Sequence, residues 1–151
     1  MKGLILILFA LFTFQTTTFG QSSVQINELK SSIKETYTNF CIDFNKQLPI
    51  QVDELTTLMS VVFINWKLTC NYRIDIDFRE ITDLEIQEFA ATTKKESKEN
   101  IRRMLTNSYG NLSVSLVEMM RLTGFKFVQR YLDTNGMFAF MLEYDYKDFV
   151  K

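Results

Sequence analysis

From Leu68 to Asp77 the sequence alternates without a break between apolar and polar side chains. A period of two is that of a β-strand, because successive side chains of a strand point to opposite faces of the sheet. Alternation this strict predicts a strand with one buried face and one face in water. The apolar positions are Leu68, Cys70, Tyr72, Ile74 and Ile76.

The segment from Phe125 to Tyr146 predicts a hairpin. Asn135-Gly136 is a strong signal for a two-residue turn, because both central positions of that turn need positive φ. The resulting register predicts one aromatic face and one polar face. On the aromatic face, Tyr131 is opposite Phe140, Phe127 is opposite Tyr144 and Phe125 is opposite Tyr146. On the polar face, Lys126 is opposite Asp145 and Arg130 is diagonal to Glu143. A longer turn built on Asp133, with Gly136 as a bulge, would mix the two faces, so the pattern favours the two-residue turn.

Helical patterns and a second strand fill the remaining sequence. The expected elements are a helix from Ser22 or Ser23 to before Pro49, a strand from Leu55 to Ile64, one or two helices after the capping box Thr82 to Glu85, and a short helix ending at Gly124. The predicted fold is α+β, a four-stranded antiparallel sheet from two hairpins with helices packed on one face, in the order α-ββ-αα-ββ.

The N-terminus has the pattern of an export signal. Lys2 precedes an almost unbroken apolar run from Leu4 to Phe14, which is shorter than the roughly 20 residues that a membrane-spanning helix needs. We expect residues 1–20 to be a signal peptide cleaved after Gly20, and residues 21–151 to be a single α+β domain in the periplasm or outside the cell. An uncleaved tether is the alternative; after cleavage no stable membrane insertion is expected.

Charge argues against one class of partner. Removing Lys2 leaves sixteen basic and eighteen acidic side chains, a net charge of −2. Nucleic-acid binding needs a clustered excess of Lys and Arg, so no nucleic-acid partner is expected.

Cys41 lies on the apolar stripe of the first predicted helix and Cys70 on the buried face of the predicted strand. Because disulfides persist in oxidising compartments, an exported chain is expected to join the two. The alternative is a pair of buried free thiols that act as small apolar side chains.

The residues for common catalytic sites are missing. The sequence has no histidine, which removes the usual general base and most zinc sites, and no glycine-rich phosphate loop. Asp75 and Asp77, with Glu80 nearby, are the remaining candidates for a carboxylate hydrolase or a calcium site. The simpler interpretation is a solvated strand face that leads into a helix N-terminus. We therefore predict no enzyme activity, no catalytic residue and no cofactor.

Four residues are candidates for binding. Trp66 occupies a predicted turn, where it either forms an exposed contact or folds back over the sheet. Arg102 and Arg103 end a basic stretch interleaved with acids, which is typical of a solvated helix but also suits a partner surface. Gln129 lies on the aromatic face, where it either bonds a tyrosine hydroxyl or anchors a small ligand.

The segments Leu48 to Leu58, Leu68 to Tyr72 and Gly124 to Gly136 resemble a set of small exported bacterial single-domain proteins. The resemblance implies an exported domain of unknown role and no catalytic residue.

The sequence as a whole predicts a non-enzymatic exported module that binds a protein or an envelope component, such as an inhibitor or immunity protein. The alternatives are a carrier of a small apolar ligand and a hydrolase that uses Asp75, Asp77 or Glu80. The sequence leaves the oligomeric state open.

Overall fold

The computed structural model describes residues 23–107 and 112–150, with side chains described for 26–28, 30–101 and 117–150. The predicted signal peptide, residues 1–20, lies outside this part. The elements in chain order are α2 (Ser23–Asn45), β1 (Ile50–Gln51), β2 (Thr56–Ile64), β3 (Lys67–Ile74), the 3-10 helix η1 (Phe78–Glu80), α3 (Asp83–Asn107), α4 (Leu112–Thr123), β4 (Lys126–Leu132), β5 (Phe138–Tyr144) and the 3-10 helix η2 (Tyr146–Asp148). No helix in the described part is both long and apolar enough to cross a bilayer.

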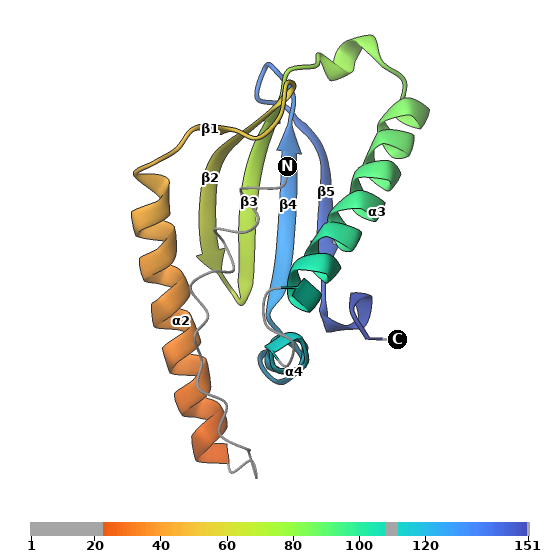
Figure 1. The fold of residues 1–151 in the computed structure, drawn as a ribbon. Helices are drawn as coiled ribbons and strands as arrows, with labels where there is room; N and C mark the ends of the chain where they lie inside the picture. The colour runs from red at the N-terminus through yellow and green to blue at the C-terminus, as the bar shows by residue number, and fades with distance from the viewer. Residues whose placement is uncertain (1–22, 108–111, 151) are drawn as a thin grey trace.

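The strands form one five-stranded sheet in the order β1-β2-β3-β4-β5 (Figure 1). The predicted α+β class and both hairpins are confirmed, but the prediction of four antiparallel strands is wrong. The hairpins join through β3 and β4, which run parallel, and the two-residue strand β1 adds a fifth strand that local periodicity did not reveal.

The length of α3 explains the parallel pairing. At about 1.5 Å per residue, its 25 residues span about 37 Å, whereas the eight residues of β3 span about 26 Å at 3.3 Å each. The helix is therefore long enough to carry the chain from the end of β3 back to the level at which that strand begins, as Figure 1 shows. After α4, the chain enters β4 at the same end of the sheet at which β3 begins, so the two strands run in the same direction.

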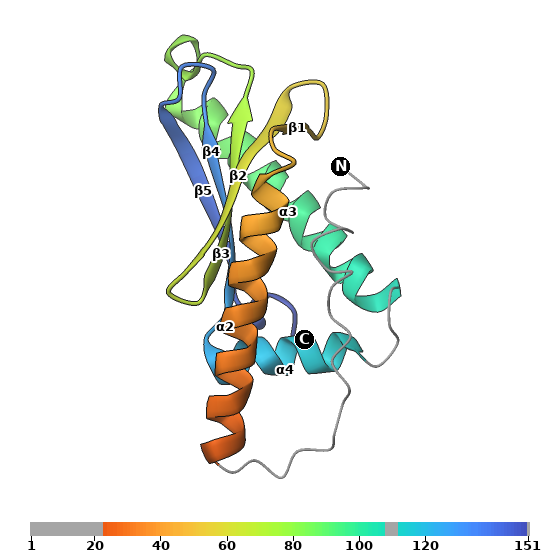
Figure 2. The ribbon, with the colours of Figure 1, turned by 90° about the vertical axis from the view of Figure 1, so that its left-hand side faces the viewer.

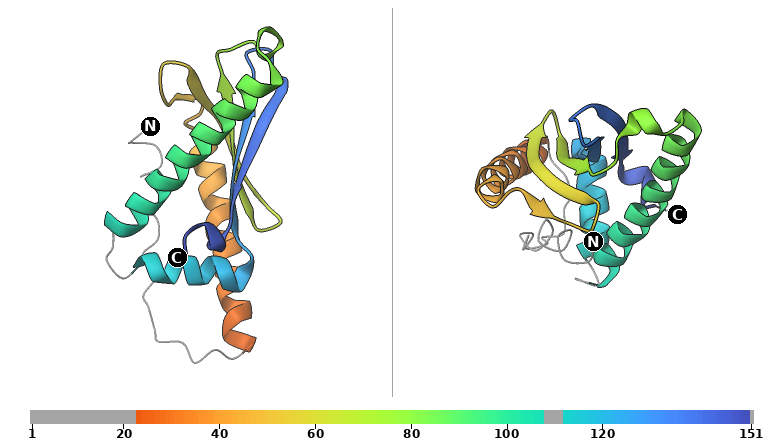
Figure 3. Two further views of the ribbon diagram at one scale, coloured as in Figure 1. Left: turned by 90° about the vertical axis from the view of Figure 1, so that its right-hand side faces the viewer. Right: turned by 90° about the horizontal axis from the view of Figure 1, so that it is seen from above.

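All the described α-helices cover the same face of the sheet. Figure 2 and the left view of Figure 3 show the sheet nearly edge-on with α2, α3 and α4 on one side, and the view from above in Figure 3 shows α2 and α3 toward opposite edges. The core between these layers is aromatic, as the sequence predicted. Tyr131 stacks between Tyr72 and Phe140, with ring centroids 5.1 and 4.6 Å apart.

The turn between β4 and β5 differs from the predicted two-residue turn. The N–H of Gly136 donates to the Asp133 carbonyl at 3.0 Å, and only Gly136 in this turn has positive φ, at 79°. The turn is thus the longer one built on Asp133. The expected pairs Tyr131–Phe140 and Phe127–Tyr144 nevertheless form, because a register shift between Tyr131 and Leu132 compensates for the extra residue. Phe125 precedes β4 and does not join the strand pairing.

The residues with paired positive φ lie instead between β2 and β3. Asn65 and Trp66 have φ values of 50° and 62°, and they join Ile64 directly to Lys67. Two consecutive positive φ values are those of a type I′ turn, which matches the twist of a hairpin.

The free edge of β2 is paired by a side chain. Beyond the short β1, Asn45 at the end of α2 donates from Nδ2 to the Val61 carbonyl at 2.7 Å and accepts from the Val61 N–H at 2.9 Å. An unpaired strand edge is a site of unwanted pairing with other chains. Asn45 thus fixes α2 to the sheet and blocks part of this edge.

Candidate functional site

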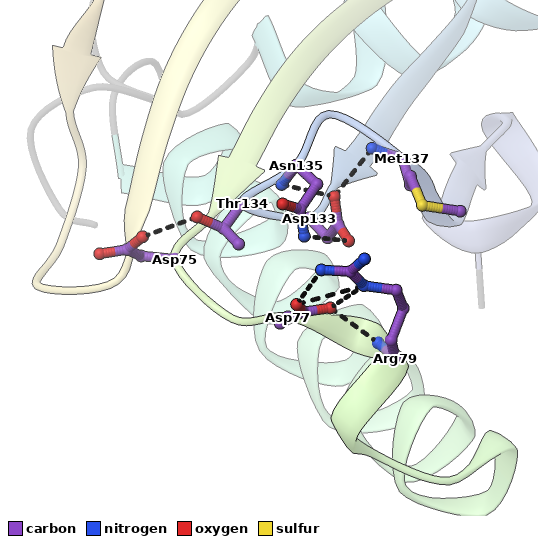
Figure 4. Close-up of polar contacts among 7 residues, drawn as sticks. All are labelled: Asp75, Asp77, Arg79, Asp133, Thr134, Asn135 and Met137. Atoms are coloured by element: carbon purple, nitrogen blue, oxygen red, sulfur yellow. Dashed lines mark hydrogen bonds and ion pairs between the residues drawn. The ribbon is translucent and has the colours of Figure 1, made fainter.

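The carboxylates singled out in the sequence are engaged at one end of the sheet (Figure 4). Asp77 accepts hydrogen bonds from the Arg79 backbone N–H at 3.0 Å and from the Arg79 guanidinium at 2.6 to 3.2 Å. These bonds hold the pKa of Asp77 well below its usual range. Asp75 accepts from the Thr134 hydroxyl at 3.2 Å. Both carboxylates therefore tie the loop after β3 to neighbouring groups, and the lowered pKa of Asp77 is the opposite of what a general acid needs.

The same end of the sheet is closed by buried Asp133, which Figure 4 shows above Arg79. Its Oδ1 accepts from the backbone N–H groups of Asn135 and Met137, both at 2.8 Å. Among the described residues, no group of three or more His, Cys, Asp or Glu side chains is arranged to hold a metal ion. The hydrogen bonds of Asp75, Asp77 and Asp133 therefore give these carboxylates a structural role in the loops at this end of the sheet.

Gln129 takes the structural role that the sequence left open. Its Oε1 accepts from the Tyr144 hydroxyl at 3.1 Å, and its side chain also bonds the Tyr72 hydroxyl. Ser97 on α3 bonds the hydroxyls of Tyr131 and Tyr144, and burial raises the pKa of Tyr144 to about 12. In the described part every buried side-chain nitrogen and oxygen has a hydrogen-bond partner. The core polar groups are thus satisfied by one another.

Cys41 and Cys70 are both buried and free, so the disulfide expected from the sequence is absent from this structure. Burial raises the pKa of Cys41 to about 11 and that of Cys70 to about 12, and the nearby Cys41 adds to the rise at Cys70. Both belong to the apolar core cluster. They act there as small apolar side chains, which was the alternative interpretation.

Trp66 folds back over the sheet and does not project from the turn. It is half-buried, and its ring meets Phe63 edge-on with centroids 6.1 Å apart. Its carbonyl accepts from the Lys126 N–H at 2.8 Å, which fixes the start of β4. Arg102 and Arg103 belong to α3, but their side chains lie outside the described residues, so their binding role stays a prediction.

The sequence predicts a polar face on each hairpin, but not that the two join through β3 and β4 into one face opposite the helices, here called the open face. Alternation along the paired strands assigns these side chains to it: Thr57, Ser60, Val62, Ile64, Lys67, Thr69, Asn71, Arg73, Lys126, Val128, Arg130, Leu132, Phe138, Met141 and Glu143. Four of them are apolar and well exposed, with exposed fractions of 63% for Ile64, 58% for Phe138, 51% for Met141 and 37% for Val62.

Ion pairs organise one end of the open face. Glu143 on β5 accepts from Lys67 on β3 at 2.6 Å through Oε2 and from Lys126 on β4 through Oε1. These two lysines hold the pKa of Glu143 below its usual range. The predicted position of Lys126 opposite Asp145 agrees with the register, in which Phe127 pairs with Tyr144, and the charge of Asp145 acts on Lys126, although the ion pair of Lys126 is with Glu143. Lys67 lies beside Lys126 because β3 and β4 are parallel and in register, which no local pattern indicates.

A second basic group lies further along the same strands. Arg130 places its guanidinium 5.8 Å from the centre of the Phe138 ring. Arg73 is exposed on β3, and neither arginine forms an ion pair with a described residue. The open face therefore combines charged groups with exposed apolar side chains.

Comparison with known proteins gives a fold likeness only. No protein-family model matches the sequence, and no curated protein matches it. Among solved structures, the pilotin EpsS of the type 2 secretion system of Vibrio vulnificus is similar with a TM-score of 0.55 and 10% identity, over 83% of this chain and 98% of that one. A candidate secreted protein from Pseudomonas aeruginosa is similar with a TM-score of 0.56 and 8% identity, over 86% of this chain and 100% of that one. The fold is therefore one that these two proteins share.

Proposed function

We propose that this chain is a non-enzymatic, exported protein-binding module of the bacterial envelope. The observation that carries the proposal is the open face, where exposed apolar side chains on β2 and β5 flank basic groups on β3 and β4. Protein interfaces combine apolar side chains with polar and charged ones. The side chains that the sequence offered for catalysis, Asp75 and Asp77, are engaged in local hydrogen bonds.

Two further observations support an envelope role. The N-terminal sequence has the pattern of an export signal. The fold is like that of a pilotin from a type 2 secretion system and of a candidate secreted protein. Inhibition of a partner enzyme is one form that such binding would take.

Carriage of a small apolar ligand is the weaker alternative. Its proposed polar anchor, Gln129, already bonds two tyrosine hydroxyls, so a ligand would have to break core hydrogen bonds. A buried polar group left without a partner costs about 1–3 kcal/mol.

Native mass spectrometry of the protein taken from its own host distinguishes the protein-binding module from the ligand carrier. We expect a mass that begins at Gln21, together with a stoichiometric second protein. A small added mass in place of a protein would favour the carrier. A bare monomer under conditions that preserve other envelope complexes would contradict the proposed function.

A further inference from the structure

The open face has an excess of basic side chains within the strands. There it carries Lys67, Arg73, Lys126 and Arg130 against the acid Glu143, although the whole chain has a formal charge of −1. Two more acids adjoin it at the strand ends, Asp75 just beyond β3 and Asp145, near Lys126, just beyond β5. An interface favours a partner of complementary potential, because like charges across it cost free energy. This bias points to an acidic partner.

The bases lie in two groups along neighbouring parallel strands. Lys67 and Lys126 are register partners at one end, and Arg130 follows Lys126 by four residues on β4, about 13 Å at the usual strand rise. Arg73 lies further along β3. Between the two groups the face presents uncharged Thr69, Asn71 and Val128. A partner that meets both groups must therefore carry separated negative charges.

Glu143 leaves donors available at the lysine end. Each of its oxygens meets one ammonium, and an ammonium has three N–H donors. Lys67 and Lys126 keep 43% and 35% of their side-chain surface exposed. The cluster of one carboxylate and two ammonium groups has a net charge of +1, which nearby Asp145 partly offsets. The N–H donors that remain on the two ammonium groups can still bind a further carboxylate.

Apolar side chains flank the basic groups on both sides. Val62 and Ile64 lie on β2, and Phe138 and Met141 lie on β5. An inorganic anion would use none of them, whereas a polypeptide with acidic and apolar side chains would cover both kinds of surface. The flanking apolar positions thus distinguish a protein partner from a small ion.

We propose that the open face binds an acidic, partly apolar polypeptide segment, whose carboxylates meet the Lys67–Lys126 pair at one end and the Arg73–Arg130 pair at the other. This inference rests on the proposed function and names the partner's chemistry. The contact surface is the sheet face turned away from the helices in Figure 2.

The test uses three synthetic peptides of equal length, built from repeats of Glu-Leu-Ser, Gln-Leu-Ser and Lys-Leu-Ser. Binding to the full mature chain is measured by fluorescence anisotropy and mapped by amide chemical shifts. We expect the Glu peptide alone to bind, with shifts in β2 to β5 on open-face residues and an affinity that falls as salt rises. Equal binding of the Gln or Lys peptide, or shifts confined to the helices, would overturn the proposal.

Charge reversal supplies the matched variants. Arg73→Glu with Arg130→Glu should weaken binding of the Glu peptide at least about tenfold. Lys94→Glu with Lys95→Glu makes the same change of net charge on exposed positions of α3, and should leave binding within about twofold. An equal loss of peptide affinity in both double variants would show a general effect of net charge and contradict the inference. If the first pair unfolds, Arg73→Gln with Arg130→Gln takes its place and should still weaken binding.

Two outcomes separate this inference from the proposed function. Binding to vesicles of phosphatidylglycerol without binding to the Glu peptide would replace the protein partner by a lipid surface and overturn both. A native partner that stays bound to the Arg73→Glu, Arg130→Glu variant would overturn the inference alone, because the protein would still be a binding module.

Discussion

Single residues at the β2–β3 turn and in the core have roles that only their surroundings explain. Trp66 has a left-handed backbone, which costs an L-residue with a Cβ roughly 1–2 kcal/mol. Its ring is held by Phe63, and its carbonyl holds the start of β4. Packing and backbone strain therefore act in opposite directions at this position.

Substitutions at Trp66 should separate these two effects. Trp66→Ala loses the ring contact and keeps the strain, whereas Trp66→Gly loses the contact and relieves the strain. We expect the Gly variant to have the higher free energy of unfolding, by about 1 kcal/mol, in urea denaturation. At Ile64, in the strand, the order should be reversed, with Ile64→Ala more stable than Ile64→Gly. If the Ala and Gly variants had the same order of stability at both positions, the backbone strain at Trp66 would be contradicted.

The thiols give a second prediction for single residues. Because burial raises the pKa of Cys41 to about 11 and that of Cys70 to about 12, almost no thiolate is present near neutral pH. Iodoacetamide at about pH 8 should leave both unmodified in the folded protein and alkylate both in denaturant, as mass spectrometry would record. Rapid alkylation of the folded protein would contradict the burial, and a mass lighter by two hydrogens would reveal a disulfide.

Elements are joined by a few polar contacts as well as by the aromatic core. Asn45 links α2 to β2, and Ser97 links α3 to the tyrosines of β4 and β5. Such contacts specify position, because an apolar helix face alone slides more easily over an apolar sheet.

Loss of the Asn45 amide should loosen α2. Asn45→Ala leaves the Val61 N–H and carbonyl without their side-chain partner, and we expect about 1–2 kcal/mol of destabilisation in thermal or urea unfolding. Asn39→Ala, on the exposed side of the same helix, should be neutral or slightly stabilising. Equal effects of the two substitutions would mean that the bonds to Val61 contribute nothing.

The ion pairs between β3, β4 and β5 predict an acid dependence of stability. Lys126 and Lys67 lower the pKa of Glu143, so the folded state favours the charged carboxylate. This contribution is present above the ordinary pKa of about 4.5 and is lost as the pH falls through the lowered value. Glu143→Gln should therefore lose less stability than the native chain between pH 6 and pH 3 in urea titrations. A parallel loss in both proteins would contradict the linkage.

At the scale of the whole molecule, the parallel β3–β4 pair is the centre of the sheet. Each of these strands has a hydrogen-bonded neighbour on both sides, whereas β1 has only two residues and lies at an edge. We expect amide hydrogens of β3 and β4 to exchange most slowly and those of β1 to exchange early, as measured by native-state hydrogen exchange. Slow exchange limited to the β2–β3 hairpin would contradict a continuous sheet.

Local sequence determines the elements because their signals act over a few residues. The capping box at Thr82 forms, with the Thr82 N–H donating to Glu85 at 2.8 Å, and Gly124 ends α4 with φ of 73°. The alternation from Leu68 correctly predicts which face of β3 is buried. The turn after β4 was predicted wrongly, because a register shift in the strand has no signature in the turn sequence.

Only the tertiary structure decides the candidate site. Lys67 and Lys126 are far apart in sequence, and each is an ordinary exposed-face residue of its own strand. They become neighbours of Glu143 because α3 is long enough to return the chain to the start of β3, so that β4 pairs parallel and in register. Periodicity fixes which side of a strand faces water, whereas the pairing of distant strands is selected by the packing of the whole chain.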